Sequence, residues 1–221
     1  MDRDFWHRRW QRDEIAFHEA RVNHHLASWW ETVAPQSAGR VFVPLCGKAV
    51  DLAWLAQRGH EVIGVELSEI ACRDFFTERD LRVQVRQSER FLRFDGERIA
   101  LLCGDFFDLH RDHLDAARLL YDRGALVALP PDMRERYCAH LHELLPQDAR
   151  GLLVTFEFPE QGFEGPPFSV DAACLHQLLG NKWSLHRLDE RAVPEDDPIV
   201  AVRGVREVRE VAWLLERNAT A

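Results

Sequence analysis

One stretch of the chain, residues 40–66, restricts the possible folds more than any other. It reads RVFVPLCGKAVDLAWLAQRGHEVIGVE. Two short apolar runs, residues 41–45 and 62–65, are typical of buried strands, and residues 49–57 between them repeat apolar side chains at helical spacing. Gly47 supplies the tight turn that joins the first strand to the helix. The stretch therefore predicts a right-handed strand–helix–strand unit.

An acidic residue, Glu66, closes the second predicted strand 19 residues after Gly47. A carboxylate at this place can accept hydrogen bonds from both hydroxyl groups of a ribose, which indicates a nucleoside cofactor. Dinucleotide sites carry three glycines in the turn, so that the backbone can close on a pyrophosphate. Here Leu45, Cys46 and Lys48 crowd that position. The turn favours a cofactor without a diphosphate, such as S-adenosylmethionine, over NAD or FAD. A flavodoxin-like unit with a merely solvated Glu66 fits the same spacing.

Three separated segments carry a resemblance to a known family. They are residues 10–18 (WQRDEIAFH), 41–69 (VFVPLCGKAVDLAWLAQRGHEVIGVELSE) and 121–131 (YDRGALVALPP). In this order they resemble thiopurine S-methyltransferases, most of all the short bacterial form, over nearly the whole chain. The resemblance implies S-adenosylmethionine as the cofactor and the α/β class I methyltransferase fold. That fold is Rossmann-like, with a mostly parallel seven-stranded sheet, an antiparallel C-terminal strand and helices on both faces. We expect a single domain over residues 1–221, with residues 1–34 as a helical lid and 40–221 as the α/β core.

The composition fits an enzyme that acts on a small molecule. The chain has 221 residues, an apolar fraction of 46% and a net charge of −9, which argues against nucleic-acid binding. No apolar run has the length of a membrane span or the form of a signal peptide. Five widely spaced cysteines without a CxxC pair predict reduced thiols and a cytoplasmic location. His24 and His25 point apart on a predicted helix, so we expect surface histidines and no metal site. We expect a monomer.

The N-terminal segment is rich in tryptophan and is predicted to be helical from Asp4 to Trp30. Trp6 and Trp10 are spaced i, i+4 and share one helical face. That face either docks the helix on the core or covers the cofactor, because an indole attracts a cation such as a sulfonium by about 0.5–2 kcal/mol. The resemblance favours the lid, since it implies that Trp10 contacts the cofactor and that Phe17 lies against the aromatic substrate. The neighbouring His18 is either a general base or a residue that supports its surroundings through hydrogen bonds, and we favour the second role.

Two further strand ends are predicted to face the same crevice. By the resemblance, Asp105 and Phe106 contact adenine after the strand at residues 99–103, although an acidic turn there also starts a capped helix. Arg123 ends the next strand, where it either pairs with Asp122 at the surface or holds two anions, the methionyl carboxylate and an ionised thiol. The family places this arginine in the cofactor and substrate site. The predicted cofactor site comprises Trp10, Leu45, Gly47, Glu66, Asp105, Phe106 and Arg123.

Three other segments carry expectations about the sheet and the substrate pocket. Residues 81–98 are charged and alternate weakly, which is typical of a surface hairpin or an irregular strand. A strand is predicted over residues 183–188, and residues 205–216 alternate as an antiparallel edge pair would. The loop at residues 162–168 is predicted to wall the substrate pocket, with Phe168 as a substrate contact by its resemblance to the family.

The predicted reaction is an in-line transfer of the sulfonium methyl group to a soft nucleophile such as a thiolate. Opposite charges cancel in that transition state, so alignment of the reacting atoms contributes more than charge stabilisation. Arg123 is the predicted catalytic residue. No strong general base is required, because heteroaromatic thiols ionise near neutrality. Three alternatives stay open: methylation of selenium or tellurium species or another small nucleophile, a nicotinamide-dependent oxidoreductase, and a catalytically silent binding module.

Overall fold

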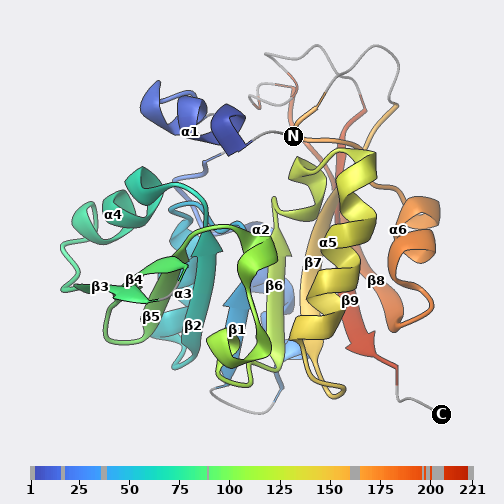
Figure 1. Ribbon diagram of the computed structural model, residues 1–221. Coiled ribbons are helices and arrows are strands. Elements are labelled where there is room, and N and C mark those ends of the chain that lie inside the picture. The colour runs from blue at the N-terminus through green and yellow to red at the C-terminus, as the bar shows by residue number, and fades with distance from the viewer. Residues whose placement is uncertain are drawn as a thin grey trace.

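One mixed β-sheet forms the centre of the computed structural model (Figure 1). The structure describes residues 3–15, 18–35, 39–88, 90–159, 165–195, 197, 200 and 207–218. Within this part of the chain nine strands follow the order β3-β4-β5-β2-β1-β6-β7-β9-β8. They are β1 (Arg40–Val43), β2 (Glu61–Glu66), β3 (Gln84–Ser88), β4 (Phe91–Asp95), β5 (Ile99–Cys103), β6 (Leu119–Arg123), β7 (Arg150–Glu157), β8 (Trp183–Ala192) and β9 (Arg209–Arg217).

Six α-helices and three 3-10 turns connect the strands in the described residues. The α-helices are α1 (Arg3–Gln11), α2 (His24–Val33), α3 (Val50–Gln57), α4 (Glu69–Thr77), α5 (Pro131–Leu144) and α6 (Ala172–Leu179). The 3-10 turns are η1 (Phe106–Asp108), η2 (Arg111–Leu114) and η3 (Leu126–Ala128). None of the described helices is both long and apolar enough to cross a membrane.

The five adjacent strands β5, β2, β1, β6 and β7 run parallel, as the sequence predicts for a doubly wound sheet. The chain builds outward from β1 in both directions, first through β2 to β5 and then through β6 to β7. A topological switch point therefore lies between β1 and β6. In open α/β sheets this is the place where a crevice forms beyond the carboxyl ends of the strands, and where ligands bind.

The prediction of seven strands is wrong in number, because residues 81–98 add two strands to one side of the sheet. β3 and β4 form an antiparallel hairpin, and β4 pairs with the edge of β5. Phe91 and Phe94 are buried and fix β4 there, with the Phe94 ring stacked 6.3 Å from that of Phe76. These two anchors are three residues apart, so they do not give the period-two alternation that identifies a strand in sequence.

The C-terminal strand is antiparallel, as predicted, but it is not at an edge. β9 lies between β7 and β8 and pairs with both along nearly its whole length, while β8 forms the outer strand. β8 also continues to Ala192, beyond the predicted end at Leu188, through a bulge between Arg187 and Asp189. The alternation in residues 205–216 identified a strand, but neighbours far along the chain decided its place in the sheet. Residues 201–206 lie outside the described part.

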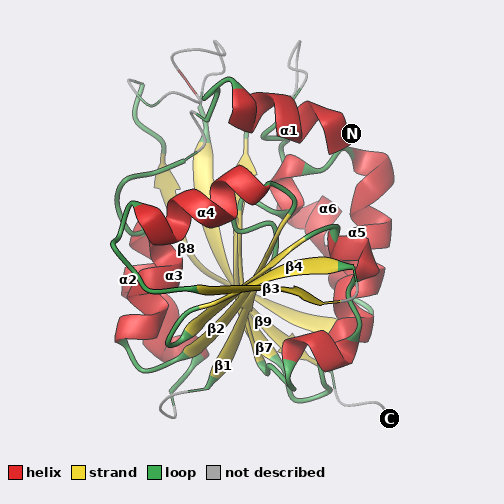
Figure 2. Cartoon of the chain, turned by 60° about the vertical axis from the view of Figure 1, so that its left-hand side comes forward, coloured by secondary structure: helices red, strands yellow, loops and turns green. Residues whose placement is uncertain are grey.

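Helices cover both faces of the sheet, as predicted, and Figure 2 shows α2 and α3 on one side and α5 and α6 on the other. Each side has its own hydrophobic cluster. The first cluster joins Leu26, Trp30, Leu52 and Leu55 of α2 and α3 to Phe75 and Phe76 of α4. The second joins Tyr137, Leu141 and Leu144 of α5 to Leu175 and Leu179 of α6. The strand β1 contributes to both, because successive side chains point to opposite faces.

The N-terminal segment is two helices and not one continuous helical stretch. Asn23 interrupts it, because its side chain accepts hydrogen bonds from the backbone of His25 and Leu26 and so caps α2. α2 packs on the sheet, whereas α1 lies over the end of the molecule at which α4 also lies (Figure 1). Of the two helices described in the predicted lid segment, α1 is the one that lies at this end of the molecule.

A carboxyl group is buried in the middle of the second cluster. Asp122 of β6 is almost fully buried, and it accepts hydrogen bonds from the Tyr137 hydroxyl at 2.6 Å and from the Leu126 backbone at 3.2 Å. Burial raises the pKa of Asp122 to about 6, although these hydrogen bonds act in the opposite direction. Because the folded-state value lies above that of an unfolded chain, Asp122 favours the folded state at low pH and loses that contribution as pH rises through about 6.

Replacing Asp122 with Asn should remove this pH dependence. Relative to the wild type, Asp122→Asn should gain on the order of 1–3 kcal/mol in unfolding free energy between pH 4.5 and pH 7.5, because only the wild type must keep a buried charge at the higher pH. Urea denaturation of both proteins at the two pH values measures the difference. Asp132→Asn, which removes an exposed carboxyl from the start of α5, serves as the control. Parallel pH profiles for wild type and Asp122→Asn would contradict the expectation.

Candidate cofactor and substrate site

A cavity of about 360 Å³ opens at the carboxyl ends of β5, β2, β1 and β6, where the topology predicts a ligand. Its walls come from α1, from the turn after β1, from the ends of β2 and β6, and from the segment after β5. The cavity brings together all seven residues of the predicted cofactor site, which are Trp10, Leu45, Gly47, Glu66, Asp105, Phe106 and Arg123.

The turn after β1 has a strained backbone. Leu45 has a φ of 45° and Gly47 a φ of 53°, both in the left-handed region. That region suits glycine but is rare for a bulky residue such as leucine, and such conformations persist where the surrounding structure imposes them. The constraint comes from β2, because the Cys46 backbone N–H donates to the Val65 carbonyl at 3.0 Å. The turn is thus held open with Leu45 and Gly47 on the cavity wall.

Glu66 links the turn to the end of β2. Its carboxylate is only 7% exposed, and it accepts one backbone hydrogen bond from Gly47 and one from Ser68, each at 2.8 Å. Burial raises the pKa of Glu66, while these amides favour the charged form. The two carboxylate oxygens have more lone pairs than these amides use, so a diol in the cavity can donate to the carboxylate. This arrangement fits a ribose, as the sequence predicts.

The indole of Trp10 covers the turn. It is 6% exposed, and a Cβ placed on Gly47 would lie 3.3 Å from its Cζ2 atom. A glycine at this position therefore lets α1 approach the turn closely. Lys48 lies at the rim, with its Nζ 6.0 Å from the centre of the Trp10 ring and 2.5 Å from a carboxylate oxygen of Glu78. Lys48 thus contacts both the indole and the C-terminal end of α4, and both Trp10 and Lys48 line the cavity.

The segment after β5 caps a 3-10 turn and also forms part of the cavity wall. Asp105 caps η1 through a hydrogen bond from the Phe107 backbone at 2.8 Å, and it also lines the cavity. Phe106 is buried, with its ring centre 4.7 Å from that of Tyr137, and it forms part of the same wall. Arg3 of α1 forms an ion pair with Asp105. This pair ties α1 to the end of the cavity at which adenine is predicted to bind.

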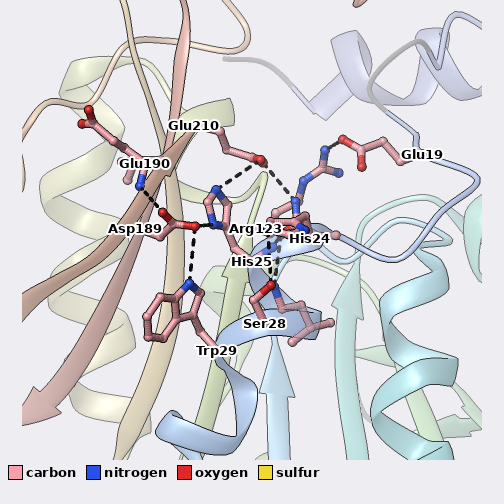
Figure 3. Close-up of polar contacts among 12 residues, drawn as sticks. Glu19, His24, His25, Ser28, Trp29, Arg123, Asp189, Glu190 and Glu210 are labelled. Carbon is pink, nitrogen blue, oxygen red and sulfur yellow. Dashed lines mark hydrogen bonds and ion pairs between the residues drawn. The ribbon is translucent and has the colours of Figure 1, made fainter. Parts of the chain in front are cut away.

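Arg123 does not pair with Asp122, because neighbouring residues of a strand point to opposite faces. Its guanidinium pairs instead with Glu19, as Figure 3 shows. The Arg123 side chain is 14% exposed, and its Nε is buried without a hydrogen bond from the described residues. A buried guanidinium with spare donors is well suited to a carboxylate or a thiolate.

His18 lines the cavity beside Arg123. Burial lowers the pKa of His18, and the positive charges of Lys48, Arg79 and Arg123 lower it further, against the effect of Glu78. The imidazole is therefore neutral near pH 7.

The two predicted substrate contacts have different outcomes. Phe17 lies outside the described residues, so its role stays a prediction. Phe168 is not among the lining residues: its ring lies 5.4 Å from the Arg134 guanidinium, and its backbone N–H donates to the Val127 carbonyl at 2.7 Å. Pro166 and Pro167 of the same loop do line the cavity.

The sequence did not single out several other lining residues. They include Glu19, Asp51, Tyr137 and Phe156. Asp51 carried a weak signal, its place in the first turn of the helix after the predicted ligand-binding turn, but that place does not determine where the side chain points. Glu19, Tyr137 and Phe156 come from separate parts of the chain and carried none.

His25 differs from the prediction of a surface residue. His24 is exposed, but the His25 ring is fully buried between two carboxylates, 3.4 Å from Asp189 and 3.5 Å from Glu210 (Figure 3). β8 and β9 supply these acids, and neither strand is near α2 in sequence. The described residues contain no group of three or more His, Cys, Asp or Glu side chains that could hold a metal ion. All five cysteines are free.

Comparisons with known proteins agree with this geometry. The family model described as thiopurine S-methyltransferase matches residues 1–218. The chain belongs to the thiopurine S-methyltransferase family. The thiopurine S-methyltransferase of Azotobacter vinelandii is 45% identical over 218 residues, which are 99% of this chain and 100% of that protein. The one from Marinobacter nauticus is 44% identical over 206 residues, which are 93% of this chain and 94% of that protein.

The fold is also shared with more distant methyltransferases. Magnesium protoporphyrin IX methyltransferase from Synechocystis, solved with S-adenosylmethionine bound, has a TM-score of 0.65 at 15% identity, over 99% of this chain and 98% of that chain. Membership of the thiopurine S-methyltransferase family makes the chain an S-adenosylmethionine-dependent methyltransferase, as the sequence predicts. The nicotinamide-dependent and catalytically silent alternatives are therefore set aside.

Replacing Glu66 with Ala should weaken the binding of S-adenosylhomocysteine by about 1–3 kcal/mol, because the ribose loses a charged acceptor. Isothermal titration calorimetry measures the change. Glu157→Ala is the matched control, since it removes a buried carboxylate from the end of β7 that does not line the cavity. An affinity equal to that of the wild type would remove Glu66 from the site.

Proposed function

We propose that this chain transfers the methyl group of S-adenosylmethionine to the sulfur of aromatic or heterocyclic thiols, thiopurines among them. The observation that supports this most directly is that Glu66 and Arg123 line the same cavity. The first supplies an acceptor for a ribose, and the second supplies a buried cation for an anionic nucleophile.

The residues of the cavity are arranged to orient the cofactor. Glu66 accepts hydrogen bonds from the ribose hydroxyls, and Asp105 and Phe106 border the adenine end. The turn at Leu45 and Gly47 supports the methionyl part. The bound cofactor supplies an electrophilic methyl group on a sulfonium centre. Trp10 covers this region and excludes water from it. Such alignment can lower the barrier by several kcal/mol, because translational and rotational freedom is lost on binding and not at the reaction step.

Arg123 holds the thiolate sulfur, and its present partner Glu19 occupies the position of an anion. Substrate binding therefore exchanges one ion pair for another. Lys48 and Arg123 line the cavity near His18, and a positive charge close to a bound thiol favours its ionised form. His18 is then a hydrogen-bonding prop and need not accept a proton from a substrate that is already ionised.

The whole chain acts in this proposal as one methyltransferase domain, residues 1–221. Residues 1–34 contribute the lid through α1, residues 40–221 form the core, and Phe17 and the loop before Phe168 border the substrate. We further propose that the protein is a monomer and that it is cytoplasmic. The five free cysteines favour the cytoplasmic location.

The substrate class is tested by incubating the protein with methyl-labelled S-adenosylmethionine and a panel of acceptors. Thiopurines and thiophenols should accept label, whereas the corresponding hydroxy compounds should not, because oxygen is the harder nucleophile. Selenite and tellurite form a second arm of the panel. Label in that arm alone would overturn thiol methylation in favour of metalloid methylation and a part in metalloid resistance.

Replacing Arg123 with Ala should lower turnover of a thiopurine roughly 100-fold or more, the range for loss of one preorganised charged contact to the reacting group. The affinity for S-adenosylhomocysteine should fall less. Single-turnover kinetics and calorimetry separate the two effects, and Arg123→Lys should recover part of the turnover because it keeps the charge without the planar fork. Equal losses in both measurements would restrict Arg123 to cofactor binding.

A further inference from the structure

A second buried carboxylate lines the cavity and has no role in the site described so far. Asp51, in the first turn of α3, is 3% exposed. Its Oδ1 accepts a hydrogen bond from the Asn23 backbone at 2.9 Å, and its Oδ2 accepts one from the Tyr121 hydroxyl at 2.8 Å. No cation of the described residues pairs with it. Burial raises the pKa of Asp51, while both hydrogen bonds favour the charged form.

A buried carboxylate without a counter-ion is unfavourable, unless a ligand brings the missing positive charge. The two donors fix the Asp51 carboxylate in one orientation and leave a lone pair on each oxygen. The first turn of α3 also favours an anion, because the helix N-terminus carries partial positive charge. Asp51 is thus a preformed acceptor for a cation on the cavity wall.

The order of the strands indicates which part of the cofactor meets Asp51. The adenine end lies beside Asp105 after β5, and the ribose lies beside Glu66 at the end of the adjacent β2. The remaining part of an extended ligand then reaches β1 and β6. There the wall includes Asp51 on the helix after β1 and, at the end of β6, Arg123 with its partner Glu19.

Tyr121 and Arg123 lie two residues apart on β6, so they share one face of the sheet, and Tyr121 holds the Asp51 carboxylate on that side. An amino-acid group, with its ammonium and its carboxylate on one carbon, complements a wall of this kind. The acid and the base are presented to the same end of the ligand.

We propose that Asp51 binds the α-ammonium group of the cofactor's methionyl part, with Asn23 and Tyr121 as the residues that position its carboxylate. The proposal rests on the proposed function only in taking S-adenosylmethionine as the cofactor. It assigns to the turn between β1 and α3 the recognition of an amino acid, beside the recognition of ribose by Glu66.

The first test uses the wild-type protein and two ligands in calorimetry. One is S-adenosylhomocysteine, and the other is its des-amino analogue, which keeps the adenosine, the thioether and the carboxylate. The analogue should bind roughly tenfold to a hundredfold more weakly, because Asp51 then remains buried without a cation. Equal affinities would overturn the proposal, whether or not any variant folds.

The second test asks whether Asp51 is the group that senses the amine. Asp51→Asn should bind both ligands with affinities within about threefold of each other, as a double-mutant cycle requires when the interacting pair is broken. Tyr121→Phe keeps the carboxylate but removes one of the two donors that orient it, so its ratio should fall between those of the wild type and Asp51→Asn. Glu66→Ala should weaken both ligands and leave the ratio unchanged. A wild-type ratio in Asp51→Asn would overturn the assignment.

The outcomes separate this inference from the proposed function. If Asp51→Asn abolishes discrimination between the ligands while no thiol accepts label, Asp51 keeps its role and thiol methylation is wrong. If thiols accept label and the wild type binds both ligands with equal affinity, thiol methylation stands and the proposal for Asp51 is wrong. If the wild type binds neither ligand, the proposal for Asp51 and the cofactor itself both fail.

Discussion

The hydrogen bonds from the Gly47 and Ser68 amides to the Glu66 carboxylate hold the site together. They connect the turn after β1 with the loop after β2. A carboxylate buried at this junction needs donors, and the backbone supplies them. The same contact fixes the turn that carries Leu45 and Gly47, and Gly47 in turn lets Trp10 approach. The cavity depends on this junction.

Charge is distributed unevenly around the cavity, and the distribution fits the chemistry. Glu66 and Asp51 are buried acids without cationic partners in the described residues, whereas Arg123 carries a positive charge at the neighbouring strand end. A sulfonium and an ammonium suit the acids, and a carboxylate or a thiolate suits the arginine. Because charge is lost as the methyl group moves, the protein has more to gain from alignment than from strong stabilisation of charge.

Packing contacts account for the places where sequence reasoning fell short. The hairpin expected at residues 81–98 is present, but the buried Phe91 and Phe94 join it to the main sheet, which has nine strands and not the expected seven. His25 is buried only because β8 and β9 bring Asp189 and Glu210 beside it. No local pattern around residue 25 encodes partners that lie more than 160 residues away.

The sequence by itself determined the central strand–turn–helix–strand unit, the acid at its end and the turn with a single glycine. These features depend on residues close together in the chain, where spacing and turn chemistry act directly. Only the tertiary structure decided that Arg123 meets Glu19 and not Asp122, that Phe168 packs on Arg134, and that Asp51 lines the cavity. Each of these contacts depends on which face a side chain takes once distant strands have paired, and sequence spacing does not carry that information.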